Sequence, residues 1–122
     1  MKTMDKVLGW LLIAFGLVHL ALTGKAHPQL GIDAIWFASG GLFMMMIGAL
    51  NLLRVAYTSM ARGVHAVSVI GNFMLLLLIV VIAIHVPMRS NPQVLVGLAL
   101  AGLLTAFSIF RRVPQVQAQA GK

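Results

Sequence analysis

The chain has 122 residues, of which 61% are hydrophobic and only 9% are charged, and its mean hydropathy is +1.01. Soluble domains carry about a quarter charged residues, so these values exclude an ordinary soluble protein. Cysteine is absent, which excludes disulfides, thiol catalysis and cysteine-ligated metal sites. We attribute the net charge of +7 to basic residues beside membrane spans and expect no nucleic-acid partner.

The first predicted span covers about residues 7–24, an apolar run that is broken only by His19 and that follows the basic leader MKTMDK. A basic start before an apolar run is also typical of a cleaved signal peptide, but we expect this segment to be retained. Gly9, Gly16 and Thr23 recur every seven residues. This spacing predicts a helix face on which a neighbouring helix packs closely.

The second predicted span covers about residues 33–54 and follows a turn that contains Pro28 and Gly31. Asp33 is expected to cap this helix, because its carboxylate can accept hydrogen bonds from the free amides of the first turn. Gly41 and Gly48 lie two helical turns apart and indicate the surface on which the other helices pack.

The third and fourth predicted spans cover about residues 63–86 and 92–110. Asn91 is expected to cap the fourth helix, with Pro92 at its first position. Four spans place both termini on one side of the membrane, and the excess of basic residues predicts that this side is the cytoplasm. The expected cytoplasmic basic residues are Lys2, Lys6, Arg54, Arg62, Arg111, Arg112 and Lys122, against Lys25 and Arg89 outside.

The expected fold is therefore all-α. Residues 1–112 should form an integral membrane four-helix bundle, up-down-up-down, with an N-in/C-in orientation in the bacterial cytoplasmic (inner) membrane. Residues 113–122 are polar and low in complexity, and we expect them to form a disordered cytoplasmic tail.

Ionisable residues within spans are candidates for function, because a bilayer disfavours them. His19 is the deepest histidine, and His85 ends the third span on the same, outer side. With Thr23 and Trp36 they form the expected ligand-binding set. Three interpretations stay open: a site for an apolar ligand, a haem or divalent metal held by His19 and His85, or a histidine that only hydrogen-bonds Thr23 or a neighbouring carbonyl. On the inner side Asn51, Asn72 and His65 are expected to hold helices together.

The sequence shows no nucleophile with a base, no phosphate-binding loop and no acidic residue expected to be buried in the membrane, which favours a non-enzymatic protein. The leading hypothesis is an accessory subunit or a binding module for an apolar small molecule or lipid near the outer leaflet. The alternatives are a haem- or metal-binding membrane protein and a small channel or transporter that acts as an oligomer. The expected partners are the lipid bilayer, a lipophilic ligand, and either further copies of the chain or a larger membrane complex.

Overall fold

The computed structural model describes residues 2–29, 31–57, 62–85 and 91–110, which form four α-helices. Their bounds are α1 Lys2–Ala26, α2 Ile32–Ala56, α3 Arg62–His85 and α4 Pro92–Phe110. All four are long and apolar enough to cross a membrane. Even the 19 residues of α4 match a bilayer core of about 30 Å, at about 1.5 Å per residue. The predictions of an all-α chain and of four apolar helices are confirmed; the expected tail at 113–122 lies outside the described residues.

The starts of three helices differ from the sequence prediction, and that of α3 differs only by one residue, at Arg62. Helix α1 begins at Lys2, within the basic leader. Asp5 lies in its first turn, where the helix dipole stabilises a carboxylate. The expected cap by Asp33 is wrong. Helix α2 begins one residue earlier, at Ile32, its N-cap residue is Gly31, and Asp33 lies within the first turn. Helix α4 does begin at Pro92, as predicted.

Helices α1 and α2 pack through a glycine seam made of Gly9 and Gly16 on α1 and Gly41 and Gly48 on α2. A Cβ atom at Gly16 would lie 2.6 Å from the carbonyl oxygen of Gly41, and one at Gly48 would lie 2.7 Å from that of Gly9. Gly9 thus faces Gly48 and Gly16 faces Gly41, so the two helices run antiparallel with their backbones in contact. The predicted close-packing faces of the first two spans meet each other.

The helices pack against one another through a core of aliphatic side chains, with Leu12, Leu75 and Leu104 fully buried. Ile47 of α2 lies against Gly71 of α3, and Ile79 of α3 lies against Gly97 of α4. Of the three consecutive methionines, Met44 is buried and Met46 is exposed, as expected for residues that point in different directions around a helix.

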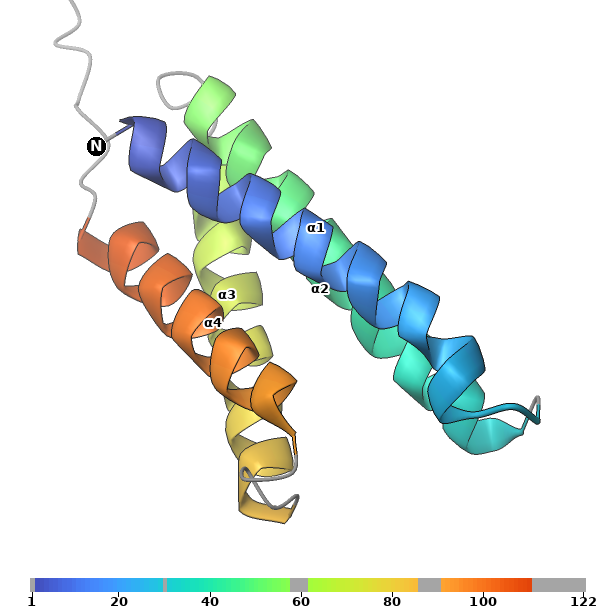
Figure 1. Cartoon of the computed structure of the whole chain (residues 1–122). Coiled ribbons are helices and arrows are strands. Elements are labelled where there is room, and N and C mark those ends of the chain that lie inside the picture. The colour runs from blue at the N-terminus through green and yellow to red at the C-terminus, as the bar shows by residue number, and fades with distance from the viewer. Residues whose placement is uncertain (1, 30, 58–61, 86–90, 111–122) are drawn as a thin grey trace, which may run out of the picture.

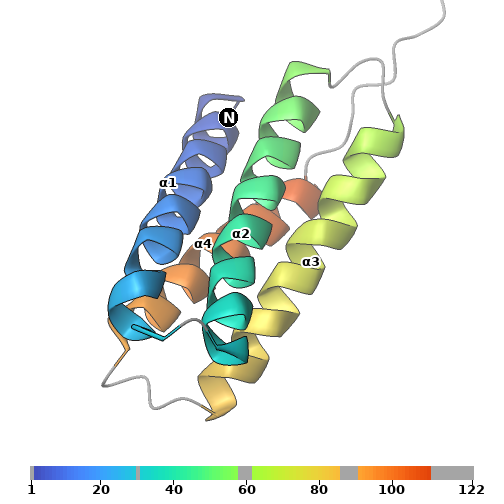
Figure 2. The ribbon, with the colours of Figure 1, turned by 90° about the vertical axis from the view of Figure 1, so that its right-hand side faces the viewer.

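The four helices form two pairs, α1 with α2 and α3 with α4 (Figure 1). The pairs lie together where α1 and α3 begin and where α2 and α4 end; we call this the closed end. They diverge toward the other end of the molecule, where α1 and α3 finish, and we call this the open end. Figure 2, turned by 90°, shows α2 between α1 and α3, with α4 behind them.

Candidate functional site

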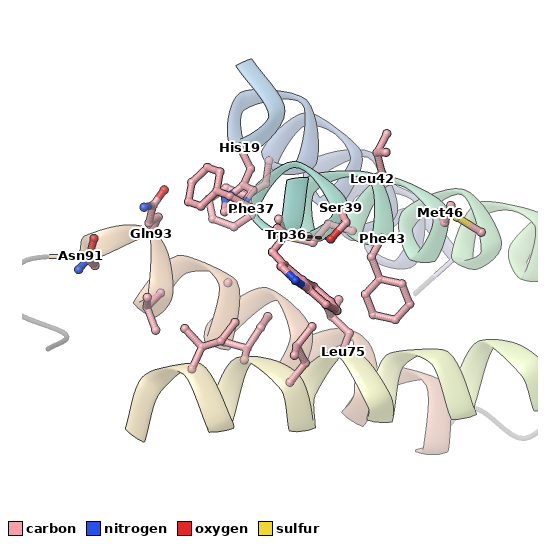
Figure 3. A pocket seen from close by; sticks show the side chains of 18 residues that line it. His19, Trp36, Phe37, Ser39, Leu42, Phe43, Met46, Leu75, Asn91 and Gln93 are labelled. Atoms are coloured by element: carbon pink, nitrogen blue, oxygen red, sulfur yellow. Dashed lines mark hydrogen bonds between the residues drawn. The ribbon is translucent and has the colours of Figure 1, made fainter. Parts of the chain in front are cut away.

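A cavity of about 830 Å³ occupies the space where the two helix pairs diverge. All four helices contribute to its lining (Figure 3). Phe15 and His19 come from α1, and the α2 residues lie between Trp36 and Met46. From α3 the lining residues lie between Leu75 and Ile82, and from α4 they are Gln93, Val94 and Gly97, with Asn91 just before the helix.

The floor of the cavity is made where α1 and α4 approach each other. A Cβ at Gly97 would lie 3.5 Å from the ring of Phe15 and 3.4 Å from Ile79, which are ordinary van der Waals distances, so α4 lies against both α1 and α3 at this position. Gly97 is buried, and Phe15 and Val94 are half-buried. Half of the lining residues of α2 and α3, in contrast, are exposed, among them Trp36, Leu42 and Leu78. The cavity is therefore closed toward α1 and α4 and open at the side between α2 and α3.

His19 is the ionisable residue of the cavity. Its imidazole stacks on the ring of Phe37, with ring centroids 3.9 Å apart and planes inclined by 15°. Gly40 lies beside this side chain, since a Cβ there would be 3.5 Å from the His19 Nε2 atom, an ordinary van der Waals distance. On the other side, His27 contacts the same Phe37 ring, with centroids 5.3 Å apart. Phe37 thus contacts two histidines, His19 of α1 and His27 directly after this helix.

The other residues of the predicted ligand-binding set divide into two groups. Trp36 lines the cavity, and the Thr23 hydroxyl donates to the backbone carbonyl of His19 at 3.3 Å. The contact between Thr23 and His19 therefore involves the main chain of His19 and not its imidazole. His85 is exposed at the end of α3, with its Nδ1 atom 2.8 Å from the Val81 carbonyl oxygen, and it does not line the cavity.

The proposed metal or haem pair, His19 and His85, is therefore split between the cavity and an exposed helix end. Among the described residues no group of three or more His, Cys, Asp or Glu side chains is placed to hold a metal ion. In the described part of the chain, the residue that joins His19 at the Phe37 ring is His27, which follows α1 directly.

The predicted helix-packing residues Asn51 and Asn72 hydrogen-bond each other in both directions at the closed end. The Asn51 amide donates to Asn72 Oδ1 at 2.6 Å, and the Asn72 amide donates to Asn51 Oδ1 at 3.0 Å. The Asn72 amide also lies 3.4 Å from the Leu104 carbonyl of α4, and Ser68 donates to the Leu50 carbonyl of α2. These bonds join α2, α3 and α4. His65 is half-buried near Arg54 and interacts with it electrostatically.

Asp5 and Arg54 form a second polar contact at the closed end, between α1 and α2. Their side chains are 1% and 2% exposed, and Arg54 Nη2 lies 3.8 Å from Asp5 Oδ2. One expectation from the sequence is corrected: an acidic residue is buried among the helices, with Arg54 as its buried partner.

Several residues of the cavity were not predicted. Phe15, Phe37 and Phe43 resemble ordinary apolar residues of a span, and no local pattern distinguishes their role. Gln93 lies directly after Pro92, and its polar side chain in the first turn of an apolar helix is a signal that could have been read. One feature of the sequence indicates that Asp5 has a basic partner: Asp5 is one of just two acidic residues in a chain with nine basic residues.

Comparison with known proteins provides no relative for this arrangement. No protein-family model, curated protein sequence or solved structure matches the chain.

Proposed function

We propose that this protein is a small, non-enzymatic integral membrane protein that binds an apolar small molecule or a lipid in the cavity between its helix pairs. The observation that carries this proposal is the cavity itself. Its volume of about 830 Å³ falls in the range of small-molecule sites, about 300–1,000 Å³. Its lining is mostly aliphatic and aromatic, with His19, Ser39, Asn91 and Gln93 as polar side chains. This combination is typical of sites for lipophilic ligands.

The proposal includes an orientation. The helices run up-down-up-down across the bacterial cytoplasmic membrane with both termini in the cytoplasm, so the open end and the cavity lie in the outer leaflet. The basic residues support this orientation even when Arg54 is removed from the count, since Lys2, Lys6, Arg62, Arg111, Arg112 and Lys122 still outnumber Lys25 and Arg89. The side opening between α2 and α3 then faces lipid, from which an apolar ligand enters.

The geometry favours a binding site over the alternatives. A haem or metal held by His19 and His85 receives less support, because His85 lies outside the cavity. A path across the membrane also receives less support, because the cavity lining ends at Met46 and Leu75, and the Asn51–Asn72 pair beyond them is fully buried.

Native mass spectrometry of the protein in mild detergent tests the proposal. We expect a lipophilic molecule to copurify with the wild-type chain. Gly40→Leu should remove it, because the new side chain extends beside His19 into the cavity. Gly102→Leu is the matched control, since a Cβ at Gly102 meets nothing within 4 Å and this glycine does not line the cavity. A ligand that survives Gly40→Leu, or no ligand in the wild type, would contradict the proposal.

A further inference from the structure

The aromatic residues of the chain are concentrated around the cavity. The chain has six Phe, two Trp and one Tyr, and four of these residues line the cavity: Phe15, Trp36, Phe37 and Phe43. Figure 3 shows the Trp36 and Phe43 rings extending from α2 toward α3, across the open space. Aromatic rings attract other flat rings in stacked or edge-to-face arrangements. The lining is therefore suited to a ligand that contains a flat ring.

The polar groups of the cavity are uncharged amides, a hydroxyl and rings. Of the described residues that line the cavity, 18 in all, none is Asp, Glu, Lys or Arg. Proteins recognise phosphate headgroups chiefly with arginine and lysine, so this lining does not suit the headgroup of an anionic phospholipid. A neutral imidazole and the Gln93 amide both donate and accept hydrogen bonds, so they suit carbonyl and hydroxyl oxygens.

The opening of the cavity leads sideways and not along the bundle. Contacts between α2 and α3 include Ile47 with Gly71 and the Asn51–Asn72 pair. The cavity lining begins next to these contacts on the side of the open end, at Met46 beside Ile47 and at Leu75 one helical turn after Gly71, where the two helix pairs diverge (Figure 1). An apolar tail attached to a bound ring can leave through this gap and remain among lipid chains.

We propose that the ligand has a flat, uncharged ring with carbonyl or hydroxyl oxygens and an apolar tail, which is the chemistry of a lipid-soluble quinone. This inference rests on the proposed function, since it names the class of molecule that the cavity takes. The ring lies among the aromatic side chains with an oxygen near His19, and the tail leaves between α2 and α3. The proposal concerns binding and includes no redox step.

Tryptophan fluorescence tests this inference directly, because a quinone quenches a tryptophan that it contacts. Trp10→Phe leaves Trp36 as the one tryptophan, and Trp36→Phe leaves Trp10, which is 63% exposed on α1 and outside the cavity. A short-tailed benzoquinone, titrated into each variant in detergent, should quench Trp36 saturably. Trp10 should show only the linear quenching of a reagent dissolved in the micelle. Equal, linear quenching of both would overturn the inference.

Two further variants, each combined with Trp10→Phe, locate the quinone. Gly40→Leu should abolish the saturable phase and Gly102→Leu should retain it. His19→Phe keeps a ring beside Phe37 but removes the hydrogen-bonding nitrogens, and it should weaken binding about tenfold, the equivalent of about 1.4 kcal/mol. Unchanged affinity in His19→Phe would remove His19 from the site.

A competition distinguishes failure of the inference from failure of the proposed function. Wild-type protein, Gly40→Leu and Gly102→Leu are incubated with equal amounts of the quinone and a phosphatidylglycerol, and bound molecules are identified by native mass spectrometry. A quinone adduct that only Gly40→Leu loses is expected. A phospholipid adduct with that dependence would overturn the quinone chemistry and leave the cavity as a lipid site. If neither reagent forms an adduct that Gly40→Leu removes, both proposals are contradicted.

Discussion

At the scale of single residues, the buried polar groups of this protein occupy two different settings. At the closed end Asn51 and Asn72 bond each other, so their polar atoms serve to join helices. At the open end His19 and Gln93 line a space that none of the described residues fills. Hydrogen bonds within a bilayer stabilise helix contacts modestly. An imidazole that lines an apolar cavity can instead hydrogen-bond a ligand. The closed end is therefore structural and the open end carries the candidate site.

The Asn51–Asn72 pair leads to a first prediction about stability. Asn51→Ala and Asn72→Ala should each lower the free energy of unfolding by about 1–2 kcal/mol, since each leaves a buried amide without its partner. Because both variants break the same contact, the double variant should lose about 1 kcal/mol less than the sum. Unfolding in mixed micelles with increasing dodecyl sulfate provides the measurement. Additive losses would show that the two amides act independently.

The Asp5–Arg54 pair leads to a second prediction. Arg54→Met removes the guanidinium beside a buried carboxylate, and removal of one partner of a buried ion pair costs about 3–5 kcal/mol. The double variant Asp5→Leu with Arg54→Met replaces both charges by apolar groups and should regain most of this loss. Arg62→Met is the control, because Arg62 is exposed, and it should change stability by less than about 0.5 kcal/mol. Thermal unfolding in detergent compares the four proteins, and a double variant as unstable as Arg54→Met would refute the pairing.

At the scale of helices, the glycine seam holds α1 and α2 as one unit. In a bilayer, apolar surfaces gain little by leaving lipid, so close backbone contact and van der Waals packing associate the helices. The seam brings the carbonyl oxygens of Gly9 and Gly41 within reach of the opposite helix. The closely packed α1–α2 pair therefore forms one side of the cavity. The side chains of Trp36, Phe37 and Phe43 extend from it along the cavity.

A third prediction tests the seam with a matched pair of variants in one helix. Gly16→Ala would place a Cβ 2.6 Å from the Gly41 carbonyl oxygen, so the backbones must separate. We expect it to destabilise the protein by about 1–3 kcal/mol, as overpacked cores do. Gly24→Ala meets nothing within 4 Å and should be neutral or stabilising by up to about 1 kcal/mol, because alanine favours helix over glycine. Equal effects of the two variants on unfolding in mixed micelles would contradict close packing at Gly16.

The helices could be predicted because their signals are local. Runs of apolar residues and the position of Pro92 depend on neighbours in sequence, and small residues seven apart fall on one helix face whatever the fold. The pairing of Asn51 with Asn72 could also be proposed, since two amides in adjacent spans have few other partners. The buried position of Asp5 could not be predicted, because it depends on the start of α1 at Lys2 and on the approach of Arg54 from the end of α2.

The candidate site was only partly predictable for the same reason. His19 and Trp36 stand out as polar or amphipathic residues near one end of a span. The cavity, however, results from the divergence of two helix pairs, a tertiary feature with no local signature (Figure 1). His85 has the same sequence signal as His19 and lies outside the cavity, because side chains on α3 at 75, 78, 79 and 82 line it, whereas position 85 is exposed at the helix end.

At the scale of the whole molecule, the two ends of the bundle have opposite roles. Polar contacts join the helices at the closed end, the glycine seam holds α1 against α2 from there to the level of the cavity, and the cavity at the open end has its opening between α2 and α3. The location of the site in the bilayer therefore depends on which end faces the cytoplasm. The proposed orientation puts the basic leader and the end of α2 in the cytoplasm and the connection after α1 outside.

Cysteine labelling tests this orientation in a chain that has no cysteine of its own. Gln29 is exposed after α1 and Tyr57 is exposed at the end of α2, at opposite ends of the α1–α2 pair. On intact cells, a membrane-impermeant maleimide should label Gln29→Cys at once. Tyr57→Cys should react only after the membrane is opened, because the excess of basic residues keeps that side in the cytoplasm. The reverse pattern would move the cavity to the inner leaflet, where its ligand would have to be drawn from the cytoplasmic half of the bilayer.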